Sequence, residues 1–171
     1  MKKILSAILA LVAILTSLTS CDDDGYVEYV NEEIGIAYTI YEDMEEPFVS
    51  RNTITTQNED GSILFVINWF EVASLEKNLG VGFTIADYVY DAINDLGIAD
   101  ATDVRFNREG TRASFEISTA QTEEEIPQYL FHLIVKGSEY LYVIQYGCSE
   151  GDRELYESEF KQLATKINTF K

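Results

Sequence analysis

Hydrophobic residues recur at every second position over several short stretches, a period that is typical of strands with one buried face. The first stretch spans 34–40, where three isoleucines and a tyrosine share one face. A polar strand is expected at 51–57. Asp60-Gly61 is a strong hairpin signal that joins it to another strand at 62–71.

Alternation returns after position 100. Val104 and Phe106 indicate one strand, and a turn is expected at 107–110. Apolar residues then alternate over 113–117, which predicts the next strand. Most of the chain is therefore expected to form strands.

Two other stretches show the helical period. The first begins at Thr84, which with Asp87 resembles a capping box, and Gly97 is expected to end it in the left-handed conformation. The second covers about 152–168. Each carries one apolar stripe, formed by Ile85, Val89, Ala92 and Leu96 in the first and by Tyr156, Phe160, Leu163 and Ile167 in the second.

Two consecutive strands indicate how the layers are stacked. The stretches 128–136 and 140–147 are joined through Gly137-Ser138 and are apolar at consecutive positions. Adjacent residues of a strand point to opposite faces, so both faces of the central sheet are expected to be covered. With one helix for each face, the sequence predicts an α+β fold, a three-layer α/β/α sandwich around a mainly antiparallel sheet.

The N-terminus has the charge order of a bacterial export signal. A short basic start precedes an almost unbroken apolar run over 4–18, and three aspartates follow Cys21. The ending Leu18-Thr19-Ser20-Cys21 resembles the lipobox of bacterial lipoproteins. This resemblance implies that residues 1–20 are a signal peptide that is removed, that Cys21 receives a diacylglycerol and that its new amino group is acylated.

Two other interpretations of this N-terminus are open. A transmembrane helix needs about 20 apolar residues, and the run here is shorter and is followed directly by acidic residues. A cleaved signal without lipidation would yield a soluble protein, but it requires no cysteine. With acyl chains on Cys21, spontaneous release from a membrane is expected to be negligible, since each buried methylene contributes about 0.8 kcal/mol.

The chain is strongly acidic. Loss of Lys2 and Lys3 with the signal peptide leaves 10 basic residues against 30 acidic ones, a formal charge of −20. Such a chain is repelled by nucleic acid and by anionic headgroups, so no nucleic-acid partner is expected and the lipid on Cys21 supplies the membrane attachment. The expected location is the bacterial cell envelope, at the periplasmic face or the cell surface, because the aspartates after Cys21 resemble two conflicting sorting signals.

Residues 21–33 are interpreted as an acidic tether, although Tyr26, Val27, Tyr29 and Val30 would also suit an edge strand. The segment 34–171 is expected to form one domain, because about 150 residues bury roughly 70% of their unfolded surface. That domain needs no disulfide, and lipid on Cys21 would leave Cys148 as the only free cysteine.

The predicted domain is similar to the PsbP-like superfamily, which includes bacterial DcrB-like lipoproteins. The likeness rests on the order of elements over 34–170, on Gly35-Ile36-Ala37-Tyr38-Thr39-Ile40 followed by Pro47, and on the terminal Ile167-Asn168-Thr169-Phe170. Many members carry a tryptophan soon after the proline, where this chain has Phe48. Members serve mostly as accessory, scaffolding or assembly factors without a shared catalytic site, so the resemblance supplies no catalytic residues.

One short motif is typical of hydrolases. Gly147-Cys148-Ser149-Glu150-Gly151 fits the G-x-S-x-G nucleophile elbow between a strand and a helix. The only histidine, His132, is expected to pair near Val143 or Ile144, roughly 18 Å from Ser149. Hydrogen-bond reach is only about 3 Å. We therefore expect Ser149 or Asp152 to cap the final helix and His132 to be a hydrogen-bonded structural residue.

Other candidate sites also have structural explanations. Cys148 is interpreted as a half-buried structural thiol. A zinc site is not expected, because the sequence has no second histidine to act as a ligand. Gly80-Val81-Gly82 contains no cation and is expected to be a loop hinge and not an anion cradle. The acidic groups at 22–24, 42–46, 58–60 and 123–125 offer calcium ligands without EF-hand spacing, so solvated surface charge is expected and no metal or cofactor is assigned.

These observations favour a lipid-anchored extracytoplasmic accessory protein that is not an enzyme and that binds an unidentified protein or cell-envelope partner. The alternative is a small-ligand or carbohydrate-binding lipoprotein module. That module would use strand aromatics such as Tyr41, Trp69 and Phe70 as a groove.

Overall fold

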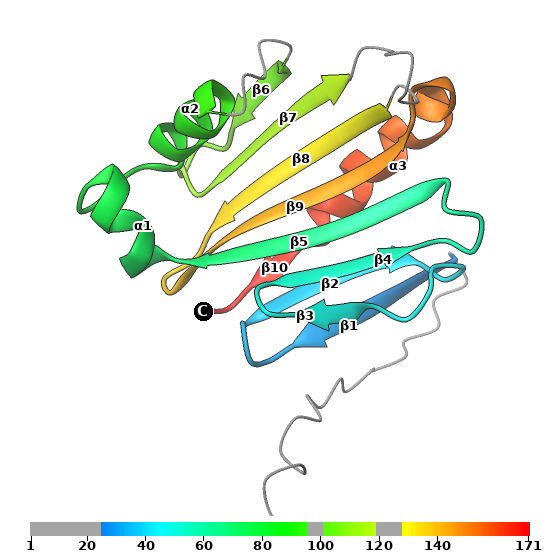
Figure 1. Ribbon diagram of the computed structural model, residues 1–171, viewed down its shortest axis with the longest axis horizontal. Coiled ribbons are helices and arrows are strands. Elements are labelled where there is room, and N and C mark those ends of the chain that lie inside the picture. The colour runs from blue at the N-terminus through cyan, green and yellow to red at the C-terminus, as the bar shows by residue number, and fades with distance from the viewer. Residues whose placement is uncertain (1–24, 96–100, 119–127) are drawn as a thin grey trace, which may run out of the picture.

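The computed structural model describes residues 25–95, 101–118 and 128–171 (Figure 1). Within these ranges the chain forms two antiparallel sheets, three α-helices and one short 3-10 helix. The expected signal peptide at 1–20 and the lipid attachment at Cys21 lie outside the described residues.

The central sheet has seven strands in the order β3-β4-β5-β9-β8-β7-β6, and every neighbouring pair is antiparallel. Its strands are β3 (Phe48–Ser50), β4 (Thr53–Gln57), β5 (Ile63–Glu71), β6 (Thr102–Phe106), β7 (Arg112–Ser118), β8 (Gln128–Lys136) and β9 (Tyr140–Ser149). The hairpins predicted at Asp60-Gly61, at 107–110 and at Gly137-Ser138 are confirmed.

A second, small sheet has the order β1-β2-β10 and consists of β1 (Tyr26–Asn31), β2 (Ile36–Tyr41) and β10 (Asn168–Thr169). Strand β1 pairs with β2 along its whole length, from Tyr26 opposite Tyr41 to Asn31 opposite Ile36. The edge-strand alternative for this segment is therefore the right one. The folded domain begins before Ile34, and the tether expected at 21–33 does not include residues 26–31.

Three helices complete the fold: α1 (Val72–Leu79), α2 (Ile85–Asp95) and α3 (Arg153–Thr165), the last preceded by a 3-10 turn at Glu150–Asp152. The capping box of α2 is confirmed, since Thr84 N–H donates to Asp87 Oδ2 at 2.7 Å and Asp87 N–H donates to Thr84 Oγ1 at 3.2 Å. Helix α1 was not predicted. It directly follows β5, and Glu71 at its start makes no side-chain capping bond.

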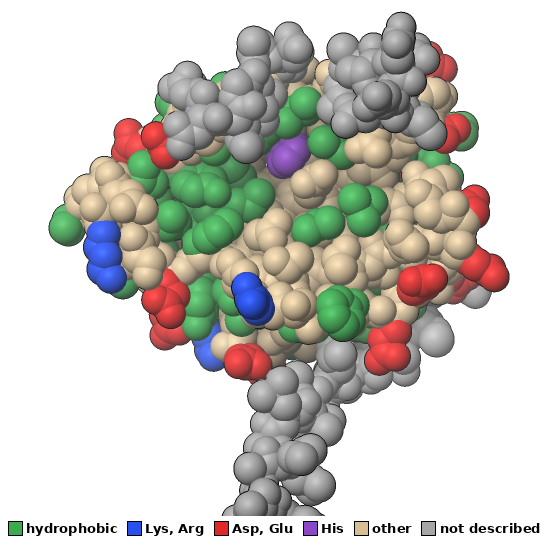
Figure 2. Space-filling view, in the orientation of Figure 1, with side chains coloured by type: hydrophobic (Ala, Val, Ile, Leu, Met, Phe, Trp, Pro, Cys, Tyr) green, Lys and Arg blue, Asp and Glu red, His purple; other side chains and the backbone are tan. Residues whose placement is uncertain are grey.

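The elements form three layers, as predicted. Helix α3 and the small sheet cover one face of the central sheet, and α1 and α2 cover the other (Figure 1). The first face holds the larger core, in which the rings of Tyr38, Phe65, Tyr146 and Phe160 follow one another at centroid distances of 5.4, 4.9 and 5.5 Å. On the other face, hydrophobic side chains gather beside α1 and α2, and acidic ones lie towards the rim (Figure 2).

The covering layers do not extend equally across the first face. The small sheet packs over β5, where Tyr38 meets Phe65, and α3 packs over β8 and β9. Strands β7 and β6 lie beyond β8, so their side chains on this face border the outer side of α3. Among the helices of the described segments, none combines the length and the hydrophobicity of a membrane span.

Candidate functional site

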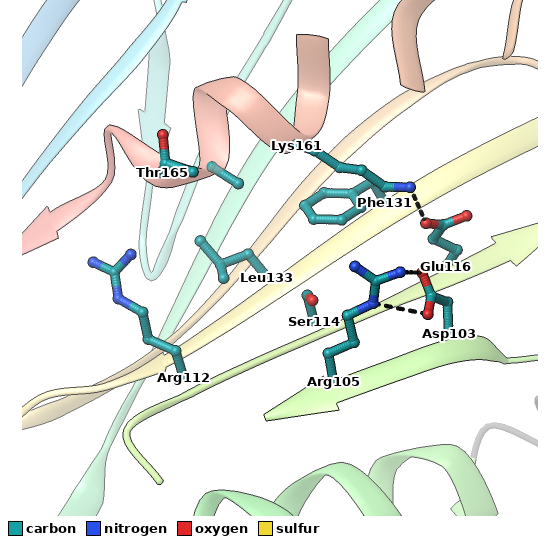
Figure 3. Close-up of a pocket in the computed structure, with 10 residues that line it drawn as sticks. Asp103, Arg105, Arg112, Ser114, Glu116, Phe131, Leu133, Lys161 and Thr165 are labelled. Atoms are coloured by element: carbon teal, nitrogen blue, oxygen red, sulfur yellow. Dashed lines mark hydrogen bonds and ion pairs between the residues drawn. The ribbon is translucent and has the colours of Figure 1, made fainter. Parts of the chain in front are cut away.

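A pocket of about 240 Å³ lies between α3 and the β6–β7 edge of the central sheet (Figure 3). We call it the charged pocket; it is lined by Asp103, Arg105, Arg112, Ser114, Glu116, Phe131, Leu133, Lys161, Ala164 and Thr165. Strands β6 and β7 supply most of its polar side chains, β8 supplies the two large apolar ones, and α3 forms the opposite wall.

The period of two along β7 explains why these side chains meet. Its odd positions, Ala113, Phe115 and Ile117, are buried against α2. The even positions must then point to the α3 face. The register places Ser114 opposite Leu133 and Glu116 opposite Phe131. The pocket therefore has charged groups beside an apolar floor.

Strand β6 adds a further pair of charges at the edge. Arg105 is paired with Ser114, and the ladder between β6 and β7 shifts register between Thr102 and Arg105. Asp103 lies inside this irregularity with a positive φ of 55°. Its carboxylate accepts from Arg105 Nε at 2.8 Å, so both side chains are held at the pocket mouth.

Glu116 is the central acid of the pocket. It is only 4% exposed, and its two oxygens accept from Arg153 Nη2 at 2.9 Å and from Lys161 Nζ at 2.6 Å. Glu157 bridges the same two cations, at 2.9 Å from Arg153 and 2.6 Å from Lys161. Burial alone would lower the pKa of Lys161, but hydrogen bonds to Glu116 and Glu157 raise it, so the ammonium stays charged.

Arg112 is engaged differently. Its guanidinium donates to the carbonyl of Ile167, just beyond the end of α3, and it forms no ion pair with any described residue. The hydroxyl of Ser114 likewise has no hydrogen-bond partner within the described segments. Donors of two pocket side chains are therefore left for another molecule, with Arg112 at one end of the pocket and Ser114 between Leu133 and Arg105 (Figure 3).

The charge of the pocket is opposite in sign to that of the chain. Three of the ten basic residues at 21–171 line it, against two of the thirty acidic ones. The lining residues have a formal charge of +1, and Arg112 is the one of these cations that has no acidic partner among the described residues. Together with its apolar floor, this arrangement is suited to bind a small anion that has an apolar part.

The structure does not assemble the hydrolase motif. His132 is opposite Gln145 and not Val143 or Ile144, and Ser149 lies four residues further along β9, roughly 13 Å away. Ser149 Oγ accepts from Asp152 N–H at 3.2 Å and donates to Asp152 Oδ2 at 2.7 Å. Ser149 thus caps the 3-10 turn that leads into α3. Asp152, the N-cap residue of α3 itself, makes no side-chain capping bond, so the predicted cap is present on the turn and not on the helix proper.

His132 is a buried structural residue, as expected, but it is not hydrogen-bonded. It is 9% exposed, its ring stacks on Phe115 at a centroid distance of 4.7 Å, and neither ring nitrogen has a partner among the described residues. Burial lowers the pKa of His132 to about 4. The imidazole is therefore neutral near pH 7, and the expectation of a satisfied histidine is wrong.

Cys148 and the Gly80-Val81-Gly82 loop have structural roles. Cys148 is 5% exposed, and burial raises its pKa to about 11, helped by Asp152 and Glu150. Its thiol is therefore protonated and poorly nucleophilic. The loop joins α1 to α2, with positive φ at both glycines, and the N–H of Gly82 already donates to Glu76 Oε1 at 3.1 Å.

The acidic clusters likewise form turns and exposed surface where they are described. Asp60 Oδ1 accepts from Ser62 N–H at 2.9 Å, and Asn58 Oδ1 accepts from Ile63 N–H at 2.8 Å. Hydrogen bonds from Ser62 lower the pKa of Asp60. Across the described residues, no group of three or more His, Cys, Asp or Glu is arranged to hold a metal ion. The clusters at 22–24 and 123–125 lie outside these residues.

The three aromatic residues proposed as a groove are not brought together. Trp69 packs with the core on the α3 face, whereas its neighbour Phe70 packs with the core on the α2 face. Tyr41 belongs to the small sheet, and its hydroxyl donates to Glu159 Oε2 at 2.8 Å. These side chains do not form one aromatic surface.

The residues of the charged pocket were not identified from the sequence. Arg105, Arg112, Glu116 and Lys161 match no motif and are scattered over 57 positions, from 105 to 161. One signal was present, because the apolar alternation at 113–117 leaves charged residues on the opposite face of the same strand. The position of α3 above that face is not contained in any local pattern.

No protein-family model matches this chain, and no curated protein matches it. Solved structures do. Cyanobacterial PsbP (CyanoP) from Synechocystis sp. PCC 6803 is 14% identical with a TM-score of 0.59, covering 90% of this chain and 99% of its own. The Ran-binding protein Mog1p of Saccharomyces cerevisiae is 8% identical with a TM-score of 0.58, covering 84% and 95%.

A protein from Bacteroides thetaiotaomicron is 16% identical with a TM-score of 0.50, covering 80% of this chain and 45% of its own. At such low identities these likenesses concern the fold alone. The chain therefore has the fold shared by cyanobacterial PsbP and Mog1p, which confirms the PsbP-like architecture predicted from its sequence.

Proposed function

We propose that this protein is a lipid-anchored, extracytoplasmic accessory protein that binds a protein partner and catalyses no reaction. The observation that carries the proposal is the charged pocket, a preformed recess whose lining residues have a formal charge of +1 in a chain with a mature charge of −20. Mog1p, which shares the fold, is a Ran-binding protein. A binding role on this fold is therefore physically reasonable.

The proposal that the protein is not an enzyme rests on the nucleophiles of the described residues. Ser149 is used as a cap and lies roughly 13 Å along the hairpin from His132. Cys148 is held as a thiol by its raised pKa. Among the described residues neither group has an imidazole within hydrogen-bond reach, and the Ser149 hydroxyl is already held by Asp152 Oδ2 at 2.7 Å within the cap.

The anchor is proposed at Cys21, within the lipobox-like Leu18-Thr19-Ser20-Cys21. Because β1 begins at Tyr26, the chain between the anchor and the domain would span at most about 17 Å even when fully extended. The domain would be held close to the membrane surface. A partner would then be a protein of the cell envelope that is also present at that surface.

The anchor is tested with Cys21→Ser in the native host. We expect the parent protein in the membrane fraction, with an intact mass that includes the acyl chains. The variant should lack the acyl chains. A processed parent protein whose first residue carries an unmodified thiol would contradict the proposed anchor. This result would leave the binding role untouched.

Binding is tested by placing a photocrosslinking amino acid at Thr165, which is exposed and lines the charged pocket. The matched control is Gln57, which is exposed on β4 near the opposite edge of the sheet. A discrete protein adduct from Thr165 and none from Gln57 is the expected result. Equal labelling from both positions would contradict a partner at this pocket.

The second candidate, a small-ligand module, is favoured by one observation. The charged pocket is about 240 Å³ in volume, just below the roughly 300–1,000 Å³ that is usual for small-ligand sites, so it has room for a very compact molecule or for part of a larger one. The aromatic groove first expected for this function is not formed. A thermal-shift screen of residues 22–171 against small acids, glycans and peptides distinguishes the two, because only a small-ligand module should respond to one small compound alone.

A further inference from the structure

We infer that the charged pocket recognises a carboxylate group carried on a short apolar stem, with Arg112 as its principal ligand. The inference rests on the proposed binding function and deepens it by naming the chemical group that is recognised. Its basis is the arrangement of cations, acids and apolar side chains in the pocket.

Arg112 has the capacity to bind an anion. An arginine side chain carries five N–H donors in a planar fork, and the hydrogen bond to Ile167 O uses only part of them. No carboxylate of the described segments neutralises this guanidinium. A planar fork matches both oxygens of a carboxylate, which gives stronger and more directional bonds than a neutral pair does.

The other two cations differ in availability. Lys161 is held between Glu116 and Glu157, both at 2.6 Å, so its charge is already balanced within the protein. Arg105 pairs with Asp103, and their side chains are 68% and 38% exposed. Exposed ion pairs contribute little to stability. Arg105 can therefore exchange Asp103 for a ligand at small cost.

The charge of the pocket selects for a single negative charge. Its three cations are opposed by Glu116 and Asp103, so the lining residues have a formal charge of +1. One carboxylate neutralises this charge. A phosphate group, which carries up to two negative charges near neutral pH, would lie against the two resident acids without a matching cation. A carboxylate is therefore the better match.

The apolar floor of the pocket is the reason why we expect the ligand to carry an apolar stem. Phe131 and Leu133 are 5% and 6% exposed and lie side by side with the polar row of β7 (Figure 3). The hydroxyl of Ser114 lies between Leu133 and Arg105, on the side of Leu133 away from Arg112 (Figure 3), and offers a further donor to a ligand that covers this floor. A ligand with methylene or aromatic carbons next to its carboxylate would cover this floor.

The carboxylate could belong to a protein partner or to a small acid. Two pairs of probes separate these sources. The first pair is hexanoate and hexanamide. The second is the peptide acetyl-Ala-Phe with a free C-terminal carboxylate and the same peptide with an amidated C-terminus. Each is titrated against ¹⁵N-labelled protein (residues 22–171 for ease of handling, repeated with the detergent-solubilised full chain). Amide shifts are followed along β7, β8 and α3.

We expect saturable shifts in these three elements with at least one acid and none with its amide. Arg112→Gln should weaken that binding roughly tenfold. Arg112→Lys, which keeps the charge without the fork, should give an intermediate affinity. Arg108→Gln is the matched control, because Arg108 is exposed in the turn of the same β6–β7 hairpin and the charge change is identical. It should bind as the parent does.

Three results would overturn the inference: no saturable shift with either acid, equal shifts with acid and amide, or equal affinities for Arg112→Gln and Arg108→Gln. Spectra of the free variants show whether each is folded, and Arg105→Gln provides a second variant if Arg112→Gln is not. Binding of hexanoate alone would support a carboxylate site while favouring the small-ligand function. If both acids fail although Thr165 still crosslinks a protein, the proposed function stands and the carboxylate inference falls.

Discussion

One face of the central sheet contains two regions with opposite chemistry. Over β5, β8 and β9, side chains such as Phe65, Ile144 and Tyr146 are at most 1% exposed beneath the small sheet and α3. At β7, on the same face, the side chains are Arg112, Ser114 and Glu116. The covering layer accounts for the difference, because it extends across β8 but not fully across β7. A core forms where the face is covered, and a recess forms where the cover ends.

The two regions should also respond differently to substitution. In the apolar region, stability comes from packing, which is lost in proportion to the volume removed. In the charged region, stability depends on keeping Glu116 paired, while the cations at the mouth contribute little.

Phe160→Ala tests the apolar region. Phe160 is 0% exposed and stacks with Tyr146 and Tyr156 at 5.5 and 5.8 Å. Removing a buried phenylalanine ring should lower the free energy of unfolding by about 4 kcal/mol. Urea unfolding measures the loss. Leu155→Ala on the same helix is the control, since Leu155 is 67% exposed and should change stability little.

The double substitution Arg153→Met and Lys161→Met tests the charged region. It leaves Glu116 buried without a cation, which should lower the free energy of unfolding by about 3 kcal/mol. This is the lower end for a buried pair, because the side chains of Arg153 and Lys161 are 31% and 34% exposed. Adding Glu116→Gln should recover most of the loss. A triple variant as unstable as the double one would show that the charge of Glu116 is not the cause.

His132 lies on the α2 face of the central sheet and allows its stability to be compared with that of the α3 face. Its folded-state pKa of about 4 lies below its ordinary value of 6.5, so the unfolded state binds more protons between these values. The resulting stability is fully present above about pH 6.5 and is lost as the pH falls towards 4. We expect a loss of about 2 kcal/mol between about pH 7 and about pH 5. In His132→Leu this part of the pH dependence should be absent. If the stability of the variant falls with pH in parallel with that of the parent, His132 is not the cause.

Arg105→Gln should have the smallest effect on folding. Its ion pair with Asp103 is exposed at the mouth of the pocket, so the midpoint of urea unfolding should be unchanged. Affinity for the carboxylate probe should still fall by roughly threefold, because one of its cations is gone. A change in stability without a change in affinity would place Arg105 among the structural residues and not the binding ones.

Much of the fold could be predicted because its signals are local. Alternation at 113–117 and consecutive apolar residues at 128–136 and 140–147 predicted three neighbouring strands of the central sheet, and the capping box at Thr84 predicted the start of α2. Helix α1 lacks such a start signal. The small sheet depends on two residues of β10 pairing with β2 across more than half of the chain, which no local pattern encodes.

The candidate site was less predictable for the same reason. Glu116 reads as a solvent-facing residue of an amphipathic strand, yet it is buried because α3 brings Arg153 and Lys161 over it. Arg112 carries no motif, and its availability depends on where the chain turns at Ile167. Periodicity places each side chain on a face, but only the packing of distant elements determines what that face meets.

The central claim, that a partner is recognised through the charged pocket, is tested most directly by crosslinking in the native host. The yield of the adduct from a photocrosslinker at Thr165 is compared between Arg112→Gln and Arg108→Gln at equal expression. We predict a yield roughly tenfold lower for Arg112→Gln and an unchanged yield for Arg108→Gln. Equal yields from the two variants would contradict the claim.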